Sequence, residues 1–281
     1  SYGLRIRMNL YGFIHPLPFG LREEQNRYYI VHAGCIRKSA GVGSKTQEWN
    51  GYPPVYPIVP IIKTSIEPNE LDCLRWLDKQ QPKFVLYVSF GSGGTLSQVQ
   101  IIELAMGLEL SNHKFLWVVR APNSSASSAY HSDQNENPLE FLPYGFLERT
   151  KGQGLVIPSW APQIEILSHS SIGGFMSHCG WNSTLESVLQ GVPLIAWPLF
   201  AKQRMNAVML SSDLKVALRL KVNGNGMVEK EDVAEVIKRL IEIESQKMRK
   251  IMKKVKEDAI NAIKEDACST KTMHQSTIKW M

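Results

Sequence analysis

The chain has 281 residues, of which 43% are hydrophobic and 21% charged, proportions typical of a soluble globular protein with one large or two smaller domains. The formal net charge of +6 comes largely from residues 247–256, where it suits the solvated face of a late helix better than a nucleic-acid surface. No apolar run reaches the roughly 18 residues of a transmembrane helix, and no signal-peptide core opens the chain. We therefore expect a cytoplasmic protein with no stable membrane insertion.

The cysteines show no metal-binding spacing and no compact disulfide framework. They are Cys35, Cys73, Cys179 and Cys268. Isolated thiols of this kind suit a reducing compartment. Metal chemistry is therefore not expected.

From residue 83 onward, short apolar runs alternate with segments of helical periodicity. The strand-like runs cover 84–88, 115–119, 155–157, 174–177 and 194–197, and the helical segments cover 97–110, 182–190, 201–212 and 229–243. Uninterrupted apolar strands separated by helices predict an α/β fold with a Rossmann-like parallel sheet covered on both faces. Such sheets bind ligands at the carboxyl ends of their strands.

Two segments do not follow this pattern. Residues 1–50 have no sustained period and stay unassigned, as an atypical remnant or linker. Residues 121–139 form a Ser/Asn-rich insertion, predicted to be a mobile surface loop, with an acceptor-gating loop as the alternative.

An aromatic residue and an amide open the most informative stretch, residues 160–203. Trp160 follows a predicted strand and precedes Pro162, which stiffens the turn and can start a helix. An indole fixed there offers a flat face to a pyrimidine. A tryptophan of the hydrophobic core would give the same sequence pattern, so this alternative stays open. Gln163 can bind a ribose hydroxyl or serve as an ordinary first-turn helix residue.

A strand-to-helix junction follows at residues 178–184. Gly180 permits close backbone approach, and Asn182 or Ser183 can cap the helix. The free amides of the first turn, aided by the helix dipole, can bind an anion without a metal. His178 adds a donor, whereas Cys179 has no evident base partner and is predicted to be a small buried residue.

Three further polar residues complete the candidate site. Glu186 lies one turn into the helix, which Gly191 should end, and its carboxylate can accept from both ribose hydroxyls. The amide of Gln203 can both donate to and accept from sugar hydroxyls. Ser92, in a Gly-rich turn after the first strand, can reach phosphate from the opposite side.

Residues 160–203 resemble the signature box of plant family-1 UDP-glycosyltransferases over its full length. Further similar segments are 53–57, 73–78, 88–92 and 141–146, so the resemblance covers about residues 49–281. The subfamily resembled most is the one that glucosylates small phenols such as hydroquinone and monolignols. The resemblance implies that residues 51–281 are the carboxyl-terminal UDP-sugar domain of a GT-B fold, with the acceptor domain largely absent.

The resemblance also implies a role for each matching residue. Trp160 would stack on uracil beside Ala161, and Glu186 with Gln163 would hold the ribose. Phosphate would be bound by Ser92, His178, Asn182 and Ser183. The sugar would contact Trp181, Lys202 and Gln203. UDP-sugar is then a co-substrate, and neither a cofactor nor a metal is expected.

The implied reaction is inverting transfer of a hexose, expected to be glucose, to a small phenolic acceptor. In the family a histidine of the acceptor domain is the general base. His15 lies in a segment only faintly similar to that region, so no catalytic residue is assigned. We expect a truncated chain with residues 1–48 read in an altered frame, and a non-catalytic UDP-sugar-binding module is the alternative function.

One residue departs from the family pattern, and one other class of enzyme is disfavoured. The family usually has Glu or Asp before the final glutamine, whereas this chain has Lys202, which predicts weakened or altered hexose recognition. A nicotinamide oxidoreductase is disfavoured because the turn at residues 91–94 lacks the G-x-G-x-x-G spacing and its acidic partner.

Overall fold

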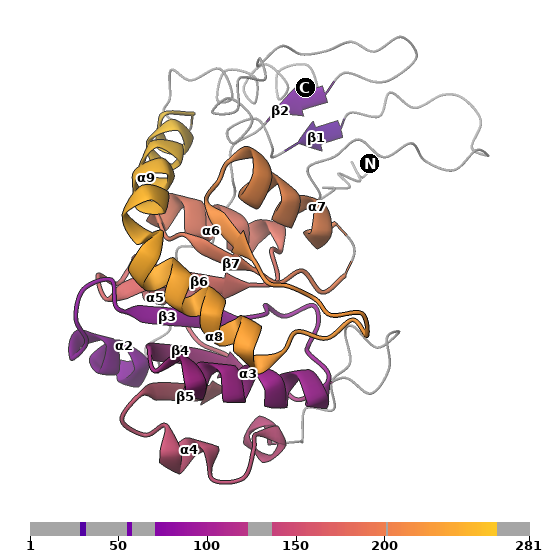
Figure 1. Ribbon diagram of the computed structural model, residues 1–281. Coiled ribbons are helices and arrows are strands. Elements are labelled where there is room, and N and C mark those ends of the chain that lie inside the picture. Colours follow the sequence, from indigo (N-terminus) through magenta and orange to yellow (C-terminus); the bar gives the residue numbers. More distant parts are fainter. Residues whose placement is uncertain (1–28, 32–54, 58–70, 123–136, 201, 263–281) are drawn as a thin grey trace, which may run out of the picture. The chain divides into compact units, whose positions relative to one another are not determined.

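The computed structural model describes residues 29–31, 55–57, 71–122, 137–200 and 202–262 (Figure 1). The chain divides into a larger unit, Lys63–Lys253, and a second unit of Ser1–Ile62 with Lys254–Met281. In the second unit, strands β1 (Tyr29–Val31) and β2 (Val55–Pro57) pair in parallel. His15 and most of the 121–139 insertion lie outside the described residues.

A six-stranded sheet forms the centre of the larger unit (Figure 1). Its strands are β3 (Val85–Ser89), β4 (Lys114–Val119), β5 (Gly154–Pro158), β6 (Ile172–Ser177), β7 (Leu194–Ala196) and β8 (Ala217–Arg219). They lie in the order β5-β4-β3-β6-β7-β8, and every neighbouring pair is parallel. The order reverses between β3 and β6, as in a doubly wound Rossmann sheet.

Helices lie before, between and after these strands along the chain and cover both faces of the sheet (Figure 1). They are α2 (Leu71–Asp78), α3 (Gln98–Ser111), α4 (Phe146–Arg149), α5 (Gln163–Ser168), α6 (Trp181–Gln190), α7 (Gln203–Val208), α8 (Lys230–Lys238) and α9 (Ser245–Ala262). Because parallel crossovers are right-handed, α3 and α6, which lead in opposite directions from the centre, lie on opposite faces. Helix α8 packs against α3, and α5 packs against α6.

The predicted α/β class and all five predicted strands are confirmed, with ends that differ by a few residues. Helices α3, α6, α7 and α8 match the predicted segments, and the last two continue into the π-helical turns Met209–Asp213 and Arg239–Ile243. As predicted, Gly191 ends α6, with a φ of 74°. The elements that were not predicted include helix α2 and the short elements β8 and α4; in the last two, three or four residues carry too little periodicity.

Strand β3 is buried along its whole length, as a central parallel strand should be. On one face, its residues Leu86 and Val88 join a core that includes Trp117 of β4 and Leu104 of α3. Tyr87 points to the other face and stacks on Phe175 of β6 with ring centroids 5.0 Å apart. This rigid centre holds the loops that follow β3 and β6.

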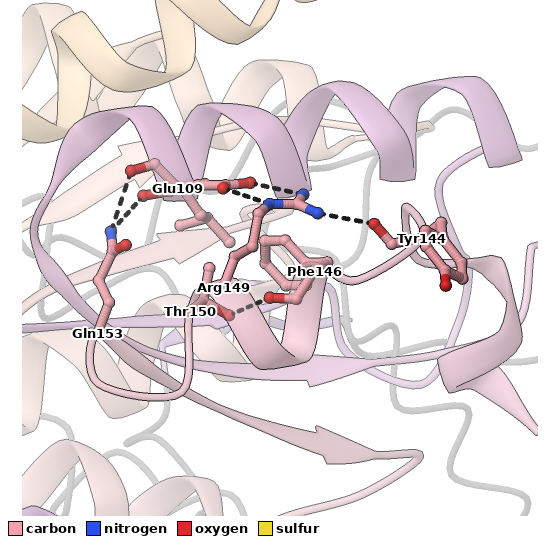
Figure 2. Close-up of polar contacts among 7 residues, drawn as sticks. Glu109, Tyr144, Phe146, Arg149, Thr150 and Gln153 are labelled. Atoms are coloured by element: carbon pink, nitrogen blue, oxygen red, sulfur yellow. Dashed lines mark hydrogen bonds and ion pairs between the residues drawn. The ribbon is translucent and has the colours of Figure 1, made fainter.

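Helix α4 is too short to be stable alone and is held in place by polar contacts to α3 (Figure 2). The Arg149 guanidinium donates to both carboxylate oxygens of Glu109, at 2.7 and 2.9 Å, and to the carbonyl of Tyr144 at 2.7 Å. Gln153 Nε2 donates to the carbonyls of Leu108 and Glu109 at the end of α3. The segment 141–146, which resembles the family, therefore has an anchored position in the fold.

Candidate functional site

The topological reversal between β3 and β6 brings two candidate loops together. One loop follows β3 and contains Gly91 and Ser92, and the other follows β6 and contains His178. Gly91 has a φ of +70°, and a Cβ atom added there would lie 2.5 Å from Cε1 of His178. Only glycine fits this close approach without strain. The two loops thus touch where doubly wound sheets bind ligands.

The His178 imidazole is enclosed by the backbone of these loops. Its residue exposure is 8%, and Nδ1 is buried without a hydrogen-bond partner. Burial lowers the pKa of His178 to about 4, because the charged form is poorly solvated. The ring is therefore neutral near pH 7 and can donate one hydrogen bond, as the sequence reading requires.

The start of helix α6 differs from the prediction that Asn182 or Ser183 caps it. The N-cap is Gly180, with no side-chain cap, and Trp181 is the first helical residue. The first intrahelical bond runs from Thr184 N to Gly180 O at 2.9 Å. The backbone N–H groups of 181–183 therefore have no acceptor in the helix, and with the dipole they form a potential anion site.

A hydrogen-bond network links helix α5 to helix α6. Gln163 Nε2 donates to Ser183 Oγ at 3.0 Å and to Glu186 Oε2 at 2.6 Å. Burial raises the pKa of Glu186, the Gln163 hydrogen bond opposes that rise, and nearby Glu165 adds to it. Oε2 of Glu186 thus has a donor in place, and Oε1 remains for a further donor.

Trp160 lies two residues after the end of β5 and three residues before the start of α5. The residue is 59% exposed, whereas the neighbouring Ala161 is buried. Ser159 adopts a φ of +66°, and Trp160 N donates to Pro158 O at 2.8 Å, so a tight turn presents the indole. The alternative that Trp160 belongs to the hydrophobic core is wrong, because more than half of its surface is exposed to solvent.

The side chain of Gln203 has fewer groups left for a ligand than the sequence analysis assumed. Its Oε1 accepts from the backbone N–H of Leu199 at 2.8 Å and of Phe200 at 3.0 Å. The amide oxygen is therefore occupied in closing the turn before α7, and Nε2 is the group left to meet a ligand. The expectation that Gln203 both donates and accepts is corrected to donation alone. Lys202 is the N-cap residue directly before it.

The remaining candidates occupy different environments. Asn182 and Ser92 are exposed at the start of α6 and in the loop after β3. Trp181 is only 8% exposed, with Nε1 buried and unpartnered, so its indole faces the protein interior. Cys179 is fully buried, and burial raises its pKa to about 12, which fits the predicted small buried residue.

Two residues near these loops were missed by the sequence reading. Asn206 of α7 donates from Nδ2 to the carbonyl of Cys179 at 2.9 Å, which fixes the residue between His178 and Gly180. Arg120, directly after β4, donates from Nη1 to the carbonyls of Gly91 and Gly94. The one signal in the sequence was an arginine directly after an apolar strand.

A second polar cluster has no comparable chemistry. His169 contacts Asp78 Oδ1 through Nε2 at 3.1 Å and Ser171 Oγ through Nδ1 at 2.8 Å. The order Asp–His–Ser suggests a hydrolase, but Ser171 is 1% exposed and cannot meet a substrate. The cluster instead ties the end of α2 to the segment before β6.

Among the described residues, no group of three or more His, Cys, Asp or Glu side chains is arranged to hold a metal ion. None of the helices described here has both the length and the apolar character for a membrane crossing.

Known proteins resemble this chain closely. Residues 59–259 match the family described as UDP-glucoronosyl and UDP-glucosyl transferase. The chain is 54% identical over 239 residues to hydroquinone glucosyltransferase of Rauvolfia serpentina, a match that covers 83% of this chain and 51% of the relative. It is 52% identical over 234 residues to UDP-glycosyltransferase 72B1 of Arabidopsis thaliana, over 81% of this chain and 49% of the relative.

Solved structures agree. UGT2 of Phytolacca americana, complexed with UDP-2fluoro-glucose and pterostilbene, has a TM-score of 0.72 and 52% identity, over 81% of this chain and 48% of that one. A UDP-glucosyltransferase from Polygonum tinctorium capable of glucosylating indoxyl has a TM-score of 0.76 and 45% identity, over 90% and 53%. The chain spans about half the length of the relatives it matches. It belongs to the plant family-1 UDP-glycosyltransferases.

Proposed function

We propose that the larger unit binds a UDP-sugar at the carboxyl edge of its sheet. Each signature residue has the role that the family resemblance implies. Trp160 and Ala161 hold uracil, while Gln163 and Glu186 hold the ribose. The diphosphate lies against the first turn of α6, and the residues that bind it are Ser92, His178, Asn182 and Ser183. The hexose contacts the Lys202–Gln203 turn and the backbone at Trp181. The assignment of residues 51–281 as the UDP-sugar domain, with 1–50 unassigned, is part of this proposal.

One observation carries the proposal more than any other. Gln163, Ser183 and Glu186 come from two different helices and form one hydrogen-bonded group beside the uncapped start of α6. A carboxylate next to an anion site suits a ligand with a diol attached to a phosphate, because each part finds its complementary group. A ribose diphosphate has that arrangement.

The site suits diphosphate binding without a metal ion. His178 is held neutral, so it donates a hydrogen bond to a phosphate oxygen without adding charge. Backbone amides and the helix dipole supply the remaining stabilisation for a leaving diphosphate. The arrangement is fixed before the ligand arrives, since His178 and Cys179 are buried and Asn206 holds their loop.

The full reaction that we propose is inverting transfer of glucose from UDP-glucose to a small phenolic hydroxyl. Support comes from the relatives, one named hydroquinone glucosyltransferase and another whose structure is complexed with UDP-2fluoro-glucose and pterostilbene. The base that deprotonates the acceptor is not assigned to a described residue. A cytoplasmic location is part of the same proposal.

Lys202 suggests a qualification about the donor sugar. The side chain before Gln203 carries an ammonium group, which donates hydrogen bonds but cannot accept them. With Gln203 Oε1 already occupied by two backbone amides, the Lys202–Gln203 turn has no side-chain acceptor left for a sugar hydroxyl. We propose that UDP binding is retained while selection among neutral hexoses is weakened.

Calorimetry with UDP and 2′-deoxy-UDP tests the binding proposal. A hydrogen bond to a charged acceptor contributes about 1.5 to 3 kcal/mol, so the chain should prefer UDP by at least about tenfold. Glu186→Ala should abolish that preference, whereas the exposed Glu148→Ala on α4 should retain it. No measurable UDP binding, or a preference that survives Glu186→Ala, would refute the proposed site.

A non-catalytic UDP-sugar-binding module is the second candidate, because no residue in the described part of the chain is assigned as the base that deprotonates the acceptor. Purified chain mixed with UDP-glucose and hydroquinone separates the two candidates. Release of hydroquinone glucoside supports the transferase. UDP binding with no glucoside formed supports the binding module.

A further inference from the structure

Arg120 occupies an unusual position for a charged residue. It follows β4 directly and is half-buried, with no carboxylate partner recorded for it among the described residues. Its Nη1 instead donates to two backbone carbonyls, Gly91 O at 3.1 Å and Gly94 O at 3.4 Å. Burial lowers the pKa of Arg120, which reflects the cost of placing a cation there.

The turn that Arg120 holds also contacts two other loops of the site. Gly91 lies against the His178 ring, as described above. Gly94 lies against Phe200, because a Cβ added at Gly94 would be 2.5 Å from Cε1 of that ring. The turn therefore packs between the loops after β6 and β7, and Arg120 contacts it from the end of β4.

The Arg120 bonds have a clear physical reason. Two carbonyl oxygens directed at one point repel each other unless a donor lies between them, and a charged donor gives the stronger hydrogen bonds. Beneath the turn lies a small hollow whose lining includes Ser89, Trp117 and Arg120, so packing alone does not fill the space. Without the guanidinium, the two carbonyls would turn toward water and the turn would lift away.

We propose that Arg120 is a positioning residue that holds the Gly91–Gly94 turn against His178 and thereby fixes the imidazole and Ser92 at the diphosphate edge. The role in ligand binding rests on the function proposed above. The role in holding the turn does not, since it concerns the chain without ligand. The two claims can therefore be tested separately.

The first test follows His178 by NMR titration without ligand, with the signal assigned through His178→Gln. Burial is the cause of the lowered pKa of His178. Arg120→Met should expose the ring and raise its pKa from about 4 toward 6.5. Arg149→Met is the matched control, because it also removes a guanidinium bonded to a carbonyl, but on α4 (Figure 2).

Arg149→Met should leave the His178 titration unchanged. If Arg120→Met fails to fold, Arg120→Lys replaces it; its shorter side chain reaches the two carbonyls less well and should raise the pKa by a smaller amount. An Arg120 variant that folds and titrates His178 as the parent chain does would overturn the proposal.

The second test measures UDP affinity and its chemical rescue. Arg120→Ala should weaken UDP binding about tenfold, as expected for lost charge-assisted hydrogen bonds. Added guanidinium should restore most of that loss by occupying the vacated space, whereas urea, similar in shape but uncharged, should not. Equal effects of guanidinium and urea would overturn the positioning role. If the parent chain binds no UDP, the proposed function fails while the titration still decides the role of Arg120.

Discussion

The buried neutral state of His178 predicts a measurable pH dependence of folding stability. In the unfolded chain this side chain takes up a proton at its ordinary pKa of 6.5, whereas in the folded chain it does so only at about 4. Between these values the unfolded state binds more protons, so acidification favours unfolding. Above about pH 6.5 both states are neutral at this residue and the effect vanishes.

The magnitude follows from the two pKa values. Protonation of His178 in the unfolded state should lower the free energy of unfolding by about 2 kcal/mol at pH 5 and by almost nothing at pH 8. His178→Gln removes the titrating group, while every other ionisable residue stays the same in both chains. The free energy of unfolding of the parent, relative to His178→Gln, should therefore fall by about 2 kcal/mol between pH 8 and pH 5.

Urea denaturation of both chains at the two pH values measures this difference. The variant need not match the parent at pH 8, because loss of packing shifts both of its values alike. A relative change below about 0.5 kcal/mol would mean that the imidazole is solvated in the folded chain. In that case the description of His178 as a neutral, enclosed donor is wrong.

Three further predictions concern the loops of the site. Gly91→Ala should lower the melting temperature, because its left-handed φ alone costs about 1 to 2 kcal/mol and the new Cβ meets His178, while Gly152→Ala, with nothing nearby, should have little effect. Gln203→Leu should destabilise the chain by about 1 to 3 kcal/mol by leaving two backbone N–H groups unpaired, and Gln203→Glu, which retains the acceptor, should restore most of this in urea denaturation. Lys202→Glu should tighten UDP-glucose binding more than UDP binding in calorimetry; an equal effect on both would contradict the role given to Lys202.

The order of elements could be predicted from the sequence because its signals are local. The apolar runs at 84–88 and 174–177 are uninterrupted, which is typical of strands buried on both faces of a parallel sheet. Gly191 ended its helix where expected, since a left-handed C-cap favours glycine. The signature residues could also be found by their resemblance to a known family.

Which groups meet, and which are already occupied, was decided by the tertiary structure. The bonds of Gln163 to Ser183 and Glu186 join two helices whose separation depends on how the crossovers pack. The oxygen of Gln203 was assigned to a sugar but is held by its own turn, and Arg120 gave no motif because its partners are backbone carbonyls. Sequence patterns report which side chains prefer to be buried, whereas hydrogen-bond partners depend on distances set by the whole sheet.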